Sequence, residues 1–175
     1  KLTNVHDGST NTIQRGYTLH GVGVNGILLK LRVHEGDVNT LNETRKMIVK
    51  KLSFSFRGKG IWVFDRGNDG KQFFVDLRQY INTQFICRLR EKRLIVLKGT
   101  GAIMKLRELP EGIHEVHLMN TNNTAVDTRY AYTLIVRKHL ANKPPIRLLC
   151  HLKDEYTSKE IVEMYLQRWG VENLF

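Results

Sequence analysis

Long apolar runs are missing from this sequence of 175 residues. The longest runs are about five to seven residues, whereas a helix needs about 20 apolar residues to cross a bilayer. No signal-peptide pattern is visible at the start of the sequence either. The sequence therefore predicts no membrane-spanning helix, and we expect no membrane partner.

Cysteine is scarce as well, with Cys87 and Cys150 as the two examples. Each lies in an apolar run typical of a buried strand, and two such thiols do not make a disulfide framework. We interpret them as reduced core thiols of a cytoplasmic protein, with a disulfide as the alternative.

Acidic residues are outnumbered by basic ones. The chain has 28 lysines and arginines against 17 aspartates and glutamates, which gives a formal net charge of +11. Such an excess favours a polyanionic partner, although ribosomal and membrane-surface proteins share it.

Strand and helix patterns alternate through the first half of the chain. Four segments are strand-like, at residues 17–24, 27–33, 60–64 and 84–89. Apolar residues at helical spacing predict a helix over residues 40–51 with Asn39 or Thr40 as its N-cap, and a second helix capped by Asp69. This order favours an α/β fold.

From residue 93 the pattern changes to short strands separated by turn residues. Five apolar segments recur at spacings of about ten residues, at 94–97, 102–106, 113–119, 130–136 and 146–152. Glycine, proline and asparagine lie between them. We predict a β-rich insertion before a final helix.

An acid follows the buried-strand pattern at residues 60–64, in the sequence Asp65-Arg66-Gly67. Open α/β sheets carry functional groups at the carboxyl ends of their strands. Taken alone, Asp65 can equally be a solvated acid that opens a turn. Arg66 is open to two interpretations, a site residue or a structural salt bridge.

The final helix has a second distinctive pattern. Thr157 with Glu160 three residues later forms a capping box. In a helix that continues from there, Tyr165, Arg168 and Glu172 share one face. The spacing alone is also typical of an amphipathic surface helix with an Arg–Glu pair.

Together the two patterns resemble the insertion-sequence DDE transposases, cut-and-paste enzymes with a ribonuclease H-like catalytic core. In that family the second aspartate often stands in an Asp-Arg-Gly turn, and the third acid lies in a Tyr-x2-Arg-x3-Glu helix. Asp65 and Glu172 occupy these positions here. Residues 7–9 and 15–17 are similar to the segment after the family's first catalytic strand. The resemblance covers essentially the whole chain, and the Tyr/Arg/Glu signature is its specific part.

The resemblance implies an α/β fold, a ribonuclease H-like mixed sheet with flanking helices. The core would occupy residues 1–92, the β-rich insertion 93–152, and the C-terminal core helix 153–175. The family's first aspartate would lie on a strand before Asp7, whose following residues are typical of a turn, and a further lysine would follow residue 175. We therefore expect a fragment of the catalytic domain, incomplete as an enzyme.

The resemblance also implies Mg²⁺-dependent DNA strand cleavage and transfer at transposon ends. Two Mg²⁺ ions, which Mn²⁺ can replace, stabilise the attacking and leaving oxygens of the phosphodiester, and Mg²⁺ prefers carboxylate oxygens. Asp65 and Glu172 would be the catalytic metal ligands, while Tyr165 and Arg168 would contact the DNA backbone. The implied partners are transposon-end and target DNA and a second copy in a homodimer, in the nucleoid-associated cytoplasm of a bacterial-type cell.

A basic run between residues 88 and 107 has Glu91 as its sole acid. We interpret it as a DNA-contacting face with Arg90, Lys92 and Arg93 as candidate contacts, and a solvated sheet surface is the alternative. Two other functions stay open: an inactive, domesticated or truncated DNA-binding domain of the same fold, and a ribonuclease H-like nuclease.

Overall fold

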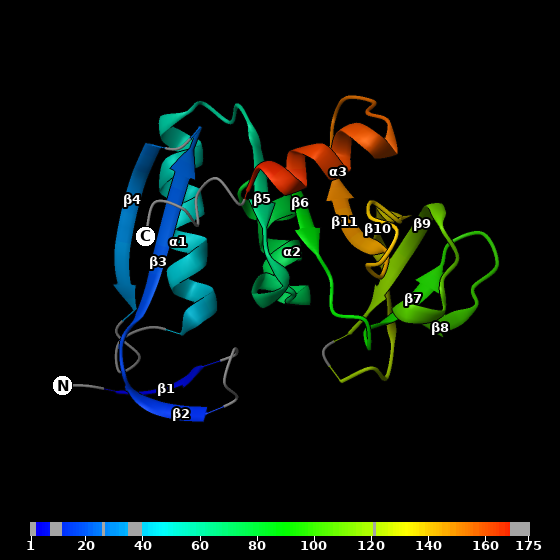
Figure 1. The fold of residues 1–175 in the computed structure, drawn as a ribbon, viewed down its shortest axis with the longest axis horizontal. Helices are drawn as coiled ribbons and strands as arrows, with labels where there is room; N and C mark the ends of the chain where they lie inside the picture. Colours follow the sequence, from blue (N-terminus) through cyan, green and yellow to red (C-terminus); the bar gives the residue numbers. More distant parts are fainter. Residues whose placement is uncertain (1–2, 8–11, 26, 35–39, 121, 169–175) are drawn as a thin grey trace. The chain divides into compact units, whose positions relative to one another are not determined.

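The computed structural model in Figure 1 describes residues 3–7, 12–25, 27–34, 40–120 and 122–168. The chain divides into two compact units, residues 1–52 with 169–175, and residues 53–168. Each unit has sheets of its own.

The first unit contains two antiparallel hairpins. β1 (Thr3–Asp7) pairs with β2 (Thr12–Gly16), and β3 (Thr18–Val24) pairs with β4 (Ile27–His34). The β3–β4 hairpin confirms the two antiparallel strands that the sequence predicts around the glycines of this segment.

Asp7 lies in a strand, whereas the residues that follow it in the sequence predict a turn. The Gly-Ser-Thr sequence after it predicts a turn, but Asp7 is the last residue of β1, where it pairs with Thr12. The pairing of two strands sets this position, and the local turn residues begin after it. Asp7 is therefore an acid at a strand end.

The helix of the first unit, α1 (Leu41–Ser55), begins as predicted but continues four residues further. Thr40 and Glu43 cap it reciprocally: the Thr40 amide donates to Glu43 Oε2 at 2.7 Å, and the Glu43 amide donates to Thr40 Oγ1 at 3.2 Å. His34 Nδ1 lies 3.1 Å from Thr44 Oγ1 and connects β4 to the helix.

The second unit is built on a seven-stranded mixed sheet in the order β5-β6-β11-β10-β9-β7-β8. Its strands are β5 (Ile61–Phe64), β6 (Gln84–Arg88), β7 (Leu94–Leu97), β8 (Ile103–Lys105), β9 (Gly112–Met119), β10 (Val126–Arg137) and β11 (Ile146–His151). β5 and β6 are parallel and the other pairs antiparallel. All strands predicted after residue 60 form, and those after residue 93 continue the sheet that β5 and β6 begin.

Two helices cover opposite faces of this sheet. α2 (Lys71–Val75), which continues into a π-helical turn (Asp76–Tyr80), places Phe74 on Phe85 of β6 with ring centroids 5.5 Å apart. α3 (Ser158–Gln167) packs against Ile86, the next residue of β6. Because successive strand residues point to opposite faces, the second unit is an α/β structure with a helix on each side.

Cys87 and Cys150 are both free and buried, which confirms the interpretation as core thiols. Burial raises the pKa of each thiol. No helix in the described part of the chain combines the length and the apolar composition needed to span a membrane.

Candidate active site at the carboxyl ends of β5 and β6

Asp65 follows β5 directly and opens a 3-10 turn formed by Arg66–Asn68. The Asn68 amide donates to the Asp65 carbonyl at 3.1 Å, and Asn68 Nδ2 donates to Asp65 Oδ1 at 2.5 Å. A Cβ at Gly67 would lie 3.3 Å from Asp65 Oδ1, closer than side chains usually approach. The Asp-Arg-Gly turn therefore holds a partly buried carboxylate in one pose, and glycine at residue 67 leaves room for it.

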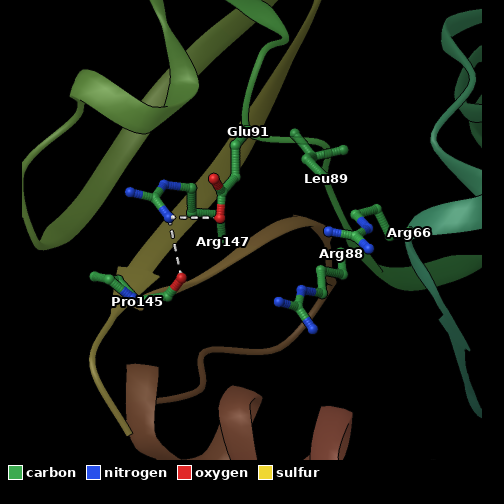
Figure 2. A pocket seen from close by; sticks show the side chains of 6 residues that line it. All are labelled: Arg66, Arg88, Leu89, Glu91, Pro145 and Arg147. Atoms are coloured by element: carbon green, nitrogen blue, oxygen red, sulfur yellow. Dashed lines mark hydrogen bonds and ion pairs between the residues drawn. The ribbon is translucent and has the colours of Figure 1, made fainter. Parts of the chain in front are cut away.

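Arg66 and Arg88 lie at this edge of the sheet too, because parallel pairing aligns Phe64 with Cys87. Figure 2 shows both side chains beside a shallow hollow, which is lined by Arg66, Arg88, Leu89, Glu91, Pro145 and Arg147. Among the described residues, neither Arg66 nor Arg88 has an ion-pair partner. Both guanidinium groups are thus available to an anion next to Asp65.

Arg147, the second residue of β11, also lines the hollow. It is buried, and it donates to the carbonyls of Leu106, Pro145 and Arg107 at 3.1, 3.1 and 3.2 Å. Its Nη1 lies 3.8 Å from Glu91 Oε1, as Figure 2 shows. Arg147 is therefore a structural brace that joins β11 to the segment after β8.

Replacing Arg147 with alanine should destabilise the protein by about 3 kcal/mol, because buried carbonyls lose their donors. Urea unfolding followed by circular dichroism measures the difference. The control is Arg107→Ala, whose side chain is 54% exposed and whose loss should change the unfolding free energy by less than about 0.5 kcal/mol. Equal losses of unfolding free energy in the two variants would contradict the structural role of Arg147.

Asp69 does not cap α2 as the sequence predicts, because Gly70 holds the N-cap position. Its carboxylate instead accepts the Arg90 amide at 2.8 Å and pairs with Arg93. Of the three candidate DNA contacts, Arg90 and Lys92 are exposed, whereas the Arg93 side chain is 17% exposed and engaged by Asp69. Arg93 thus has a structural partner, and its DNA contact stays a prediction.

The capping box of α3 forms as predicted. The Thr157 amide donates to Glu160 Oε2 at 2.8 Å, and the Glu160 amide donates to Thr157 Oγ1 at 3.3 Å. The Thr157 hydroxyl, which donates to Glu160 Oε2 at 2.7 Å, and the Thr157 amide lower the pKa of Glu160. Ile161 is buried against the sheet.

Tyr165 is also buried, with 1% of its surface exposed, whereas the sequence predicts that it borders an open site. The reason is that Tyr165 lies four residues after Ile161 and shares the face that packs against the sheet. The DNA contact by the Tyr165 hydroxyl stays a prediction, and the burial of this side chain does not support it. The Arg168 guanidinium lies over the Tyr165 ring, 5.6 Å from its centroid.

Glu172 lies outside the described residues, as does Trp169, so their predicted positions are not part of this geometry. Among the described side chains, no three from His, Cys, Asp and Glu gather in a group that could hold a metal ion. Asp65 fits Mg²⁺ as one carboxylate ligand, because it is half-exposed and lies on a rigid strand end.

Arg147 is the contributor that the sequence did not predict, whereas Arg88 begins the basic run interpreted above as a DNA-contacting face. Arg88 is the last residue of β6, and the parallel pairing that brings it to the same edge of the sheet as Asp65 is a contact between distant residues. For Arg147 the sequence carries no comparable signal. The chain matches no protein-family model, and no curated protein matches it either.

Proposed function

We propose that this protein is the catalytic domain of a DDE-type DNA transposase with a ribonuclease H-like fold, which cleaves and transfers DNA strands at transposon ends. The observation that carries the proposal is Asp65, a partly buried carboxylate bonded to Asn68 at the end of β5. Arg66 comes next in the chain and Arg88 ends the neighbouring strand, and neither has an ion-pair partner among the described residues. A phosphodiester substrate needs carboxylates for metal ions and cations for its negative charge.

The sheet supports the proposal in a second way. Among the described strands β5 pairs with β6 alone, so its other edge is available to a further strand. The proposed fold requires a neighbouring strand there that ends in the first catalytic aspartate. As the resemblance implies, we expect that aspartate on a strand that precedes Asp7 in the full-length protein.

In the proposed site Asp65, Glu172 and the first aspartate hold Mg²⁺, which supplies charge stabilisation at the attacking and leaving oxygens when bound. Arg66 and Arg88 bind phosphate oxygens of the DNA backbone and orient the strand over Asp65. The proposal includes a homodimer on paired transposon ends, in the cytoplasm at the nucleoid.

The test uses the full-length protein and a plasmid that carries its gene with native flanking DNA. We expect cleavage at the borders of the element with Mg²⁺ or Mn²⁺ and none with EDTA, detected on sequencing gels. Joining of the released ends to a second plasmid should follow. Cleavage without joining would indicate a nuclease, and the absence of metal-dependent cleavage would contradict the proposal.

A further inference from the structure

Asp69 is the most completely buried carboxylate near the candidate site, with a side chain that is 0% exposed. Its Oδ2 accepts the amide of Arg90 at 2.8 Å, and its Oδ1 pairs with Arg93. Arg93 Nη2 also lies 3.5 Å from the Asp69 carbonyl. All these bonds connect the segment after β5 with the segment after β6.

A buried ion pair gives little net stability, because desolvation of both charges offsets their attraction. The Asp69–Arg93 pair instead fixes the relative positions of two segments of the chain. Asp69 directly follows the turn that carries Asp65 and Arg66, and Arg90 follows Arg88 by two residues. The Asp69–Arg93 pair therefore fixes the turn with Asp65 and Arg66 relative to Arg88.

The packing around Arg93 keeps this connection rigid. Its guanidinium carbon lies 6.0 Å from the centroid of the buried Phe74 ring in α2. The planar guanidinium is thus held by the carboxylate and by the carbonyl of Asp69, above an aromatic ring. Both contacts with Asp69 come from Arg93 Nη2. Lysine at residue 93 would keep the positive charge but lose the planar group that lies over the Phe74 ring.

We infer that Asp69 and Arg93 are positioning residues for the proposed cleavage reaction: they set the distance between the Asp65 carboxylate and the guanidinium groups of Arg66 and Arg88. A phosphate held by these arginines then lies in reach of Asp65. The inference rests on the proposed function, since it concerns DNA at that same site. Neither Asp69 nor Arg93 needs to touch the DNA.

The experiment compares Asp69→Asn with Asp127→Asn in the full-length protein. Asp127 is a matched control, since its side chain is 8% exposed and paired with Arg129 at 2.9 Å and Lys71 at 3.3 Å. Asp127 lies at the amino end of β10. The opposite end of β10 pairs with the start of β11, and the start of β11 pairs with the end of β6, where Arg88 lies. Both variants remove a buried carboxylate from an ion pair. Asp69 connects the turn after Asp65 with the segment after β6, whereas Asp127 connects β10 with the first residue of α2, Lys71.

Single-turnover cleavage is measured with saturating DNA, well below the melting temperature of each variant. Asp69→Asn should lower the rate about tenfold to a hundredfold, because small misplacements of reacting groups have effects of that size, and should change DNA affinity much less. Asp127→Asn should stay within about twofold of wild type. Arg93→Lys should keep more of the rate than Arg93→Gln.

A wild-type rate in Asp69→Asn, or a loss that Asp127→Asn shares, would overturn the positioning role and leave the proposed function intact. If Asp69→Asn does not fold, the two Arg93 variants decide in the same way, and equal rates in them count against the inference. A wild-type protein without metal-dependent cleavage would overturn the proposed function and this inference together.

Discussion

Asp65→Ala in the full-length protein is expected to lower the rate of DNA cleavage by about 1,000-fold or more, the scale seen when a group that stabilises transition-state charge is removed. In the proposed site Asp65 supplies a metal ligand from the end of β5, and the nearby Asp69 carboxylate is already engaged by the Arg90 amide and by Arg93. The assay is plasmid cleavage in Mg²⁺, quantified under single-turnover conditions.

The same change should leave folding nearly intact. Asp65 is half-exposed and its side chain is bonded to Asn68, so we expect a loss of about 1 kcal/mol or less in the free energy of unfolding. Glu155→Ala removes an exposed acid before α3 and is the control for charge. Cleavage by Asp65→Ala at the wild-type rate would show that the catalytic acids lie elsewhere.

The companion variants Glu172→Ala and Asp7→Ala extend this comparison to the other acids. Glu172→Ala should match Asp65→Ala, because both acids belong to one proposed site and such residues act as a unit. Asp7→Ala should leave cleavage near the wild-type rate, because the resemblance puts the first aspartate on an earlier strand. A loss as large as that of Asp65→Ala would contradict this expectation.

The double variant Arg66→Ala/Arg88→Ala is expected to weaken DNA binding about a hundredfold. Each guanidinium forms charge-assisted bonds worth about 1.5–3 kcal/mol, and a loss of about 3 kcal/mol corresponds to two decades in the dissociation constant. The slope of log K against log salt should fall by about 0.9 for each lost phosphate contact. Fluorescence anisotropy over a range of salt concentrations measures both quantities.

The control for the double variant is Lys50→Ala, which removes an exposed cation from α1 and should change the slope by less than one contact. Circular dichroism confirms folding, which the loss of Arg66 and Arg88 should spare, since neither has an ion-pair partner in the described structure. An unchanged salt slope in the double variant would mean that the hollow beside Asp65 does not bind DNA phosphates.

Local patterns predicted the strands and the position of Asp65 because their causes are local. An apolar run followed by turn residues specifies both β5 and the acid that ends it. The capping box at Thr157 is equally local, since all of its hydrogen bonds join residues three positions apart.

Contacts between distant residues account for what the sequence did not predict. Asp69 has the residue type of an N-cap, but its carboxylate is taken by Arg90, 21 residues later. Tyr165 is three residues before Arg168 and four residues after Ile161, so it lies between the two on the helix surface. This spacing does not tell which side of the helix packs against the sheet. The parallel pairing that brings Arg88 beside Asp65 is a tertiary contact of the same kind.

Crystals of the full-length protein with DNA and Mn²⁺ offer the most direct test of the central claim, that Asp65 is a metal ligand for phosphoryl transfer. The anomalous signal of Mn²⁺ should place an ion about 2 Å from a carboxylate oxygen of Asp65, with Glu172 bound to the same site. A Mn²⁺ ion bound at other acids, with Asp65 and Glu172 on opposite sides of the domain, would contradict the proposed site.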